Sequence, residues 1–454
     1  MKGSIVLPVI GLSCCLMISE AGAQAFRYQT QSASGGGQAN AFSAQADDPS
    51  AIHYNPAGIT QLRGLQWSGT VQFLGATVSY HNAVEQRTSG DTGNTIALPP
   101  PSQFYVTGSL GDLGLRRLEG WTVGIGVTTP YALKSRYPEN SPFSTAIISS
   151  AIPLIDIKPT IAYRFNRHLS VGLGADIYTF SNLIGEGHVE QKFAWPGGAG
   201  IPPGARVELN GDGTAAGFNV SVLYSPLLNA DQLPIANLAF IYRSQAVLPL
   251  EGSMLVNGMA IADTRSSLTL PQTWIGAVAI WPIRDSRREW KVELDVEYVG
   301  WKSIRHTNVQ LSTGGVIPQP QNWKTVPTIS VGTEYKLLQP ESMPNWEIAL
   351  RGGYTYTLSQ VPDVTFTPGI PSINSHTIGV GLGMTCSQGG YLFGVIPCGR
   401  SEASFWRPHR IGIDASFQAW IYEPRTIQGN INPTANGTYT TSLYVGALGL
   451  RLAF

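Results

Sequence analysis

The stretch Trp290–Tyr298, WKVELDVEY, decides between the fold classes open to this chain. Apolar or aromatic residues alternate with charged residues along its whole length. Successive side chains of a β-strand point to opposite faces, so this strand has one apolar face and one charged face. A half-buried strand of a soluble protein would look the same. The conclusion therefore depends on how often the pattern recurs.

The pattern recurs from residue 65 to the last residue and predicts about fourteen strands. Most of them exceed the ~9–11 residues that cross a bilayer at a tilt, whereas strands of soluble proteins are usually nearer 5–6 residues. An even number is typical of single-chain bacterial outer-membrane barrels. The sequence therefore predicts an all-β fold, a transmembrane antiparallel β-barrel over residues 63–454. The expected strands are Leu65–Tyr80, Ser102–Leu110, Gly120–Thr129, Leu154–Phe165, His168–Phe180, Val207–Tyr224, Pro234–Leu250, Leu268–Ile280, Trp290–Tyr298, Thr325–Leu337, Trp346–Leu358, Ile373–Thr385, Arg410–Tyr422 and Thr441–Phe454.

The composition agrees with a membrane protein that spans with strands. Only 13% of the residues are charged, against about 25% in soluble domains. Beyond the N-terminus there is no run of ~18 apolar residues that could form a membrane helix, and hydrocarbon otherwise admits only closed barrels. On composition alone a large soluble β protein remains an equal alternative. The 29 basic and 29 acidic residues cancel, so no nucleic-acid partner is expected.

The N-terminus indicates export. Lys2 precedes an apolar run from Ile5 to Ile18, and Ala23-Gln24-Ala25 offers a small-residue cleavage site, so residues 1–25 are predicted to be a signal peptide. Together with the strands, this predicts a multi-pass barrel in the outer membrane of a Gram-negative bacterium. Cleavage after Ala25 would remove Cys14 and Cys15 and leave Cys386 and Cys398. No His or Cys cluster accompanies this pair, so a disulfide is more plausible than a metal site.

The segment from Phe26 to Leu62 is rich in Ser, Gly, Ala, Gln and Asn and cannot form a core of its own. A barrel of fourteen strands is too wide for its own side chains to fill, so the lumen holds water or a plug. The position of this segment before the strands predicts that it is the plug. Alternation places a further set of charges on the lumen face, next to those of Trp290–Tyr298: Lys158, Asp176, Arg243, Glu334, Glu347, Arg351, Arg410 and Asp414.

Three short motifs in this segment carry a resemblance to a known family: Ser32-Ala33-Ser34-Gly35, Ala46-Asp47-Asp48, and Asn55-Pro56-Ala57-Gly58. They resemble the N-terminal hatch of the FadL-type outer-membrane proteins, and the resemblance extends over the mature chain. It implies a hatch over residues 26–62 and passive uptake of long-chain fatty acids or aromatic hydrocarbons. The sequence does not separate these two substrates. The alternative function is a surface receptor, an adhesin or a structural barrel without transport.

In that family the third strand bends inward and lets an apolar substrate leave sideways into the bilayer. The corresponding stretch here is Trp121–Leu133, in which Gly124, Gly126 and Pro130 are the candidates for a lateral gate. Pro130 cannot donate a hydrogen bond to a neighbouring strand. The two glycines have an alternative explanation, because they would also make room for the hatch.

Two expected outer loops contain apolar residues. Exposed apolar residues favour aggregation, so we expect these to have a binding role. These capture candidates are Phe193, Trp195 and Ile201 in residues 182–205, and Met254, Leu255, Met259 and Ile261 in residues 251–267. The family resemblance implies a hydrophobic substrate groove here, and anchoring at the membrane interface is the alternative.

The last strand places Leu448, Leu450, Leu452 and Phe454 on one face. A terminal Phe resembles the signal read by the barrel-assembly machinery, which is therefore an expected partner through Phe454. Outer-membrane lipid and lipopolysaccharide are the other expected partners, and the chain is expected to be a monomer. The sequence has no Gly-x-Ser-x-Gly, His-Glu-x-x-His or phosphate-binding motif, so we expect no enzyme activity, no cofactor and no metal.

Overall fold

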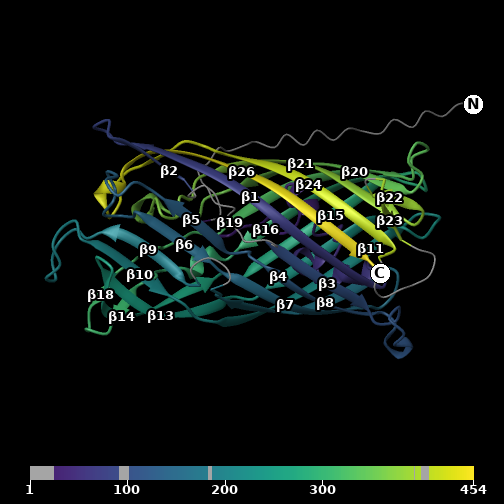
Figure 1. The fold of residues 1–454 in the computed structure, drawn as a ribbon, viewed down its shortest axis with the longest axis horizontal. Coiled ribbons are helices and arrows are strands. Elements are labelled where there is room, and N and C mark those ends of the chain that lie inside the picture. The colour runs from purple at the N-terminus through teal and green to yellow at the C-terminus, as the bar shows by residue number, and fades with distance from the viewer. Residues whose placement is uncertain (1–24, 92–101, 183–186, 393, 400–407) are drawn as a thin grey trace, which may run out of the picture.

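The wall of the molecule is one antiparallel sheet that closes on itself (Figure 1). The computed structural model describes residues 25–91, 102–182, 187–392, 394–399 and 408–454. Over these residues the sheet forms a barrel of 14 strands, and it closes where β26 pairs with β1 from Gln66↔Ala453 to His81↔Thr438. Residues 1–24, most of the predicted signal peptide, lie outside the described residues.

Several wall strands are built from two consecutive elements. In chain order the wall consists of β1 (Leu65–His81), β2 (Arg87–Asp91) with β3 (Gln103–Ser109), β4 (Trp121–Thr128) with β5 (Ala132–Arg136), β6 (Ser149–Pro153) with β7 (Ile155–Arg164), β8 (Leu169–Thr179) with β9 (Val189–Ala194), β10 (Arg206–Gly211) with β11 (Ala215–Leu228), β12 (Pro234–Arg243) with β13 (Ala246–Val256), β14 (Met259–Leu270) with β15 (Thr273–Arg284), β16 (Arg288–Val299), β19 (Val326–Leu338), β20 (Trp346–Thr357), β21 (Ser375–Ser387), β24 (Arg410–Tyr422) with β25 (Arg425–Ile427), and β26 (Gly437–Ala453).

The remaining elements are short. They are α1 (Ala33–Gly37), α2 (Ala51–Tyr54) and η1 (Pro56–Gln61) in the N-terminal segment, η2 (Arg116–Leu118), η3 (Trp301–Ser303), η4 (Asp363–Thr365) and η5 (Pro433–Ala435) in connections, and the strands β17 (Val309–Leu311), β18 (Val316–Ile317), β22 (Gly390–Leu392) and β23 (Ile396–Cys398). Among the described residues, no helix has both the length and the apolar character needed to cross a membrane.

Each of the fourteen strands predicted from alternation overlaps a wall strand, which confirms the all-β barrel. The predicted boundaries between strands and connections are partly wrong, because β2, β5, β6, β9 and most of β14 lie between the expected strands, and the last two lie within the expected outer loops 182–205 and 251–267. These strands pair with one another, as in β5–β6, β6–β9 and β13–β14. They extend the barrel wall at the end opposite the C-terminus (Figure 1).

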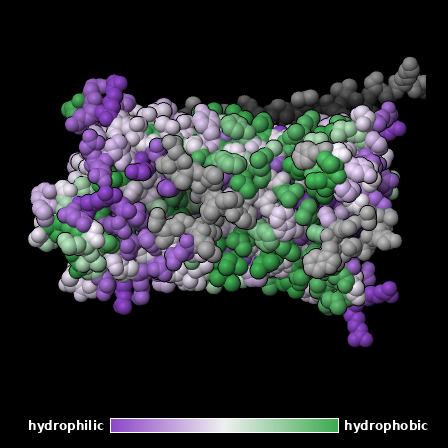
Figure 2. Space-filling model, in the orientation of Figure 1, coloured by the Kyte–Doolittle hydropathy of each residue, from purple (hydrophilic) through white to green (hydrophobic). Residues whose placement is uncertain are grey.

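The two faces of the wall differ as the alternation predicts. On β16, Leu294 is 44% exposed on the outside, whereas Lys291 is 1% exposed on the inside. On the side of the barrel in view, Figure 2 shows apolar side chains gathered away from the end that carries β2 and β9, where polar side chains dominate. The apolar belt faces lipid, and the charges face the lumen.

Residues 26–62, called here the N-terminal segment, run inside the barrel. Helix α1 lies against β20, β21, β24 and β26, and η1 lies against β4, β7, β8 and β11. Nearly all of its residues are buried. The strands therefore enclose a core made of this small, polar segment.

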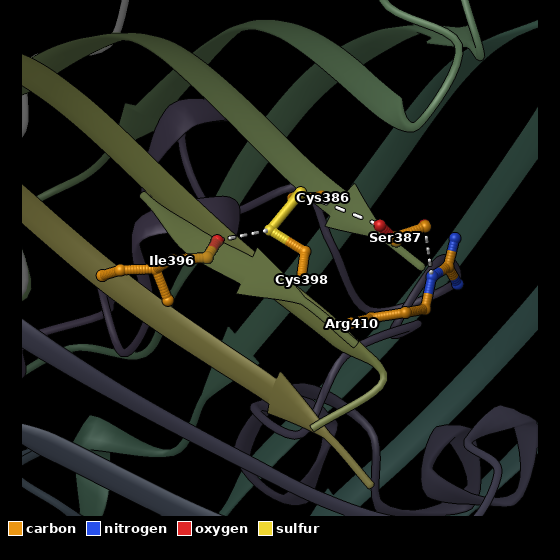
Figure 3. The surroundings of a disulfide bond; sticks show 5 residues. All are labelled: Cys386, Ser387, Ile396, Cys398 and Arg410. Carbon is orange, nitrogen blue, oxygen red and sulfur yellow. Dashed lines mark hydrogen bonds between the residues drawn. A yellow bond between two sulfur atoms is a disulfide. The ribbon is translucent and has the colours of Figure 1, made fainter. Parts of the chain in front are cut away.

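The long turn after β21 contains the cysteine pair (Figure 3). The structure joins Cys386 and Cys398 by a disulfide, with 5.7 Å between the Cα atoms. The bond connects the end of β21 to the hairpin β22–β23, and Arg410 Nε donates to Ser387 Oγ at 3.4 Å beside it. Residues 393 and 400–407 of the turn lie outside the described residues.

Candidate ligand cavity and its floor

The Asn55-Pro56-Ala57-Gly58 motif fixes the N-terminal segment against the wall. Asn55 caps η1, since its side-chain oxygen accepts from Ala57 N at 3.1 Å, and its amide donates to Ser43 O at 2.9 Å. Pro56 occupies the first position of η1, where its missing N–H costs nothing. Ala57 N also donates to Ser221 Oγ of β11 at 2.8 Å. A Cβ on Gly58 would lie 2.5 Å from Ala46 O, so only glycine fits there.

The charged face of β16 holds the N-terminal segment. Glu293 accepts a hydrogen bond from Ala44 N at 2.6 Å, and Asp295 accepts one from Ser43 N at 3.2 Å. Lys291 Nζ donates to Ala41 O at 3.2 Å. Glu297 forms an ion pair with Arg27 at 2.5 Å, and Gln29 donates to it at 2.8 Å. The lumen charges predicted on this strand therefore bind the protein's own N-terminal segment.

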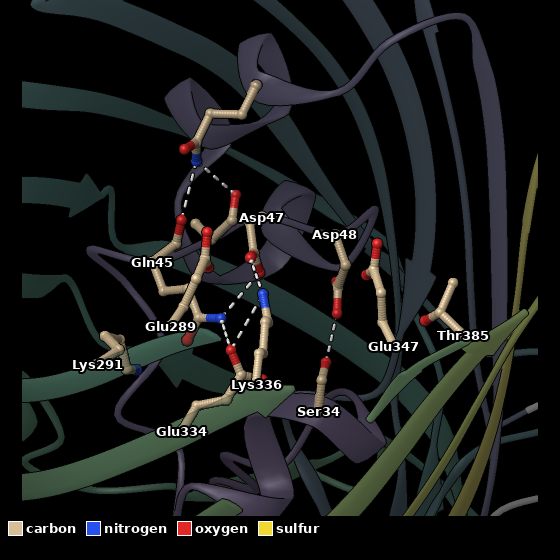
Figure 4. Close-up of polar contacts among 12 residues, drawn as sticks. Ser34, Gln45, Asp47, Asp48, Glu289, Lys291, Glu334, Lys336, Glu347 and Thr385 are labelled. Atoms are coloured by element: carbon tan, nitrogen blue, oxygen red, sulfur yellow. Dashed lines mark hydrogen bonds and ion pairs between the residues drawn. The ribbon is translucent and has the colours of Figure 1, made fainter. Parts of the chain in front are cut away.

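A second group of charges continues this attachment around the lumen (Figure 4). Lys336 pairs with Asp47 at 2.8 Å and with Glu334 at 3.1 Å, and Gln45 donates to Glu334 at 2.6 Å. Arg351 links Glu334 to Asp414, at 2.6 Å each. Asp48 accepts hydrogen bonds from Ser34 and Ser50 within the segment.

The remaining lumen charges that alternation predicted pair with one another or with this segment. Lys158 pairs with Asp156 at 2.6 Å and with Asp176, and Arg243 donates to the carbonyl of His53. Glu347 and Arg410 form an ion pair that is partly exposed. The charged side chains of the lumen are therefore largely neutralised by one another and by the N-terminal segment.

A cavity of about 300 Å³ lies between Phe26 and the end of the barrel that carries β9, β10 and β14. Its walls come from these strands, from β6, and from the connections around residues 145–147, 304–323, 365–370 and 430–432. Most of the surface it presents is apolar, with serine, threonine, asparagine and glutamine side chains between the apolar ones. Such a lining suits a hydrophobic ligand.

The floor of this cavity is an aromatic cluster built on the first residue of the N-terminal segment. The Phe26 ring lies 5.4 Å from Trp301, 5.8 Å from Trp323 and 5.9 Å from Tyr131, measured between ring centroids. Phe26 is 1% exposed. Phe26 and Trp323 line the cavity, so a ligand in the cavity would contact the N-terminal segment at Phe26.

Tyr137 anchors a loop beside this cavity. Burial raises the pKa of its phenol above the ordinary value. The phenol donates to Pro368 O at 2.8 Å, and its ring packs on Phe143 at 4.9 Å. These contacts tie two outer connections together.

The third wall strand is interrupted next to the floor. It leaves the sheet after Thr128 and resumes at Ala132. Across the interruption it pairs with the N-terminal segment instead, since Tyr28 N donates to Pro130 O at 2.8 Å and Ala132 N donates to Phe26 O at 2.9 Å.

The second and third wall strands pair on both sides of this interruption. Among the described residues, they pair up to Phe104↔Val127 on one side of the interruption and at Asp91↔Arg136 on the other. Residues 92–101, which follow β2, lie outside the described residues. The stretch Phe26–Tyr28 therefore both closes the cavity and lines the interruption.

The gate candidates fall into two groups. Pro130 lies in the interruption, but Gly124 and Gly126 lie in the regular part of β4 and pair with both neighbouring strands. A Cβ on Gly124 would come 2.7 Å from Ile52 Cδ1, and one on Gly126 would come 2.9 Å from Tyr105. The Cβ on Gly126 would also lie 3.0 Å from Ile52 Cγ2, so both glycines make room for α2, as the alternative explanation states. A gate at Gly124, Gly126 or Pro130 stays a prediction.

The candidates for substrate capture also fall into two groups. Phe193, Trp195, Ile201 and Met254 pack in one apolar cluster with Val207, Leu209 and Val309, called here the outer cluster. Met259 is 70% exposed, Ile261 is also exposed, and Leu255 is half-buried outside the outer cluster. Because Phe193, Leu209 and Val309 also line the cavity, the outer cluster continues into it. Its role in capture stays a prediction.

Sequence reasoning missed most of the cavity lining. Ile304, Ile317 and Trp323 come from one outer connection and Phe366 and Ile370 from another. Their loops contain a similar proportion of apolar residues to the two selected loops, so the same argument about exposed apolar loops would have found them. Phe26 carried no signal beyond its position after the predicted cleavage site.

Comparisons with known proteins agree with this architecture. Residues 14–389 match the family described as outer membrane protein transport protein (OMPP1/FadL/TodX). The chain is 22% identical over 396 residues to a long-chain fatty acid transport protein of Salmonella typhi, covering 82% of this chain and 86% of the relative.

Two solved structures show the same fold. A FadL homologue of Pseudomonas aeruginosa superimposes with a TM-score of 0.72 at 16% identity, over 95% of this chain and all of the other. The toluene transporter TodX of P. putida superimposes with a TM-score of 0.55 at 15% identity, over 89% of this chain and 94% of the other. The family match spans most of the sequence, and the chain therefore belongs to the OMPP1/FadL/TodX family of outer-membrane transport proteins.

Proposed function

We propose that this protein carries hydrophobic compounds passively through the outer membrane. The observation that supports the proposal most strongly is the double role of Phe26–Tyr28, which closes an apolar cavity and lines an interruption of the wall. The named relatives, a fatty acid transport protein and a toluene transporter, suggest the same class of cargo.

The proposed route has three stages. The outer cluster around Phe193 and Met254 takes up a hydrophobic molecule from the outside. The molecule then moves into the adjoining cavity, where burial of apolar surface contributes about 25 cal/mol per Å². It leaves sideways, past Pro130 and into the bilayer, when the floor moves.

The contacts of the floor suggest that a small movement is enough. Phe26–Tyr28 is attached by two backbone hydrogen bonds to the third wall strand, by the ion pair of Arg27 with Glu297, and by ring contacts. The rest of the N-terminal segment has many more polar contacts with the wall, including those of Ser43, Ala44 and Asp47. We therefore propose that only its first residues shift, while the remainder keeps the lumen closed to water.

Uptake by cells tests the proposal. A strain that lacks this gene would be compared with the same strain carrying the gene, with radiolabelled long-chain fatty acid and with labelled toluene as cargo. We expect the gene to increase the initial uptake rate of at least one of them. Equal rates with and without the gene, with folded barrel detected in the outer membrane of the strain that carries the gene, would contradict the proposal.

A further inference from the structure

The cavity above Phe26 has an uncharged lining. None of the described residues that line it has an ionisable side chain. Apolar contacts come from residues such as Ile147, Leu268 and Phe366, and the polar positions are amides and hydroxyls such as Gln191 and Thr307. A molecule in this space would meet no formal charge from a side chain.

Two cations near the lining are already neutralised. Arg27, next to Phe26, is in an ion pair with Glu297 in which both side chains are 7% exposed. Arg425 lies behind the Phe366 ring, with its guanidinium carbon 5.2 Å from the ring centroid. That guanidinium pairs with Asp363 at 2.5 Å and also donates to the carbonyls of Val361, at 2.7 Å, and Ser372, at 2.8 Å. Neither cation is available to a ligand carboxylate.

We propose that this cavity selects uncharged hydrophobic molecules, such as hydrocarbons and esters, over carboxylates of the same size. The inference rests on the proposed function and narrows its substrate class. A carboxylate in the cavity would lose its water and gain no counter-charge from a side chain of the lining, which is strongly unfavourable. At a pH above the pKa of the acid, we expect methyl hexadecanoate to bind about a hundredfold more tightly than hexadecanoate. The preference should shrink as the acid becomes protonated.

Direct binding to the mature full-length chain in lipid nanodiscs tests this preference. Two radiolabelled pairs would be measured, methyl hexadecanoate against hexadecanoate and toluene against benzoate, with binding to empty nanodiscs subtracted. Equal or tighter binding of the anions would overturn the inference and leave the transport proposal standing. Cleavage after Ala25 gives Phe26 a free amino group, and tighter binding of the anions would identify it as a counter-charge. If none of the four compounds binds saturably, both the inference about charge and the transport proposal would be overturned.

A charge placed in the lining gives an independent test. Ser266 is half-buried on β14 and lines the cavity. We expect Ser266→Lys to tighten hexadecanoate binding about tenfold relative to Ser266→Met, because an ion pair then forms in a partly dehydrated site. The methionine side chain is unbranched, nearly as long as that of lysine, and uncharged. Equal hexadecanoate affinities of the two variants would overturn the role of charge in selection.

Discussion

Gly172 shows how closely the barrel wall fits the N-terminal segment. A Cβ at this position of β8 would lie 2.4 Å from Ala57 N and 2.6 Å from the Pro56 carbonyl carbon. Both are backbone atoms held by the cap of Asn55 and by the hydrogen bond to Ser221, so they cannot easily move. The missing side chain of Gly172 is therefore what allows the motif to reach the wall.

We expect Gly172→Ala to loosen the N-terminal segment from the wall. The overlap should destabilise the packed segment by about 1–3 kcal/mol, the usual effect of overpacking a core. The readout is entry of a large antibiotic that an intact outer membrane excludes, with folded barrel measured on gels of unheated samples. Gly446→Ala is the matched control, since a Cβ at Gly446 meets no atom within 4 Å. Equal antibiotic sensitivity of the two variants would contradict this account of Gly172.

The role of a single residue could be predicted from the sequence where it depends on contacts with residues nearby in the chain. Asn55, Pro56 and Gly58 form a cap and a turn within a few positions, and their residue types indicate this directly. Gly124 and Gly126 were ambiguous, because their role depends on Ile52, which is distant in sequence and reaches them only in the folded lumen.

Among the elements, the stretch Phe26–Tyr28 forms the part that we propose to move. It behaves as a short extra strand, with Arg27 opposite Tyr131 in an antiparallel bridge. Neither backbone hydrogen bond in this bridge connects two wall strands. The stretch can therefore detach while the ladder of the closed sheet stays intact.

We expect a disulfide between cysteines at 27 and 131 to stop transport. The two residues face each other as a pair that exchanges no hydrogen bonds, in which Cα atoms are about 4.5 Å apart, within the range a disulfide spans. Oxidised Arg27→Cys/Tyr131→Cys protein in vesicles should lose most of its transport rate, and a reductant should restore it. Wild-type protein through the same cycle controls for reduction of Cys386–Cys398, and the two single variants control for the lost side chains. Undiminished transport by the oxidised protein would contradict a moving floor.

The wall strands were predictable because membrane-spanning alternation is long and regular. The strands that extend the wall were missed, since β2, β5 and β6 have only five residues each and no apolar stripe facing lipid. The cavity was missed for a related reason. Its lining is assembled from several connections, and no single stretch of sequence shows that they meet.

At the scale of the whole molecule, the barrel places its charged and apolar side chains in the reverse of the arrangement found in a soluble protein. Charged side chains lie inside, paired with one another and with the N-terminal segment, and apolar side chains face outward around the belt in Figure 2. The free energy of a charge on the outer face should therefore depend on its depth in the membrane, since lipid tails solvate it poorly and the interface solvates it well.

Strand β16 allows that dependence to be measured on one face. Leu294 lies at the middle of the strand and Tyr298 near its end, and both side chains point outward. We expect Leu294→Arg to lower the free energy of unfolding in lipid vesicles by about 2–4 kcal/mol, and Tyr298→Arg by about 0–1 kcal/mol. Denaturant titrations followed by tryptophan fluorescence would give both values, with Leu294→Ala and Tyr298→Ala accounting for the lost side chains. If the two arginine variants lost the same free energy of unfolding, Leu294 would not face the hydrocarbon core. The assignment of this strand face to the outside of the barrel would then be wrong.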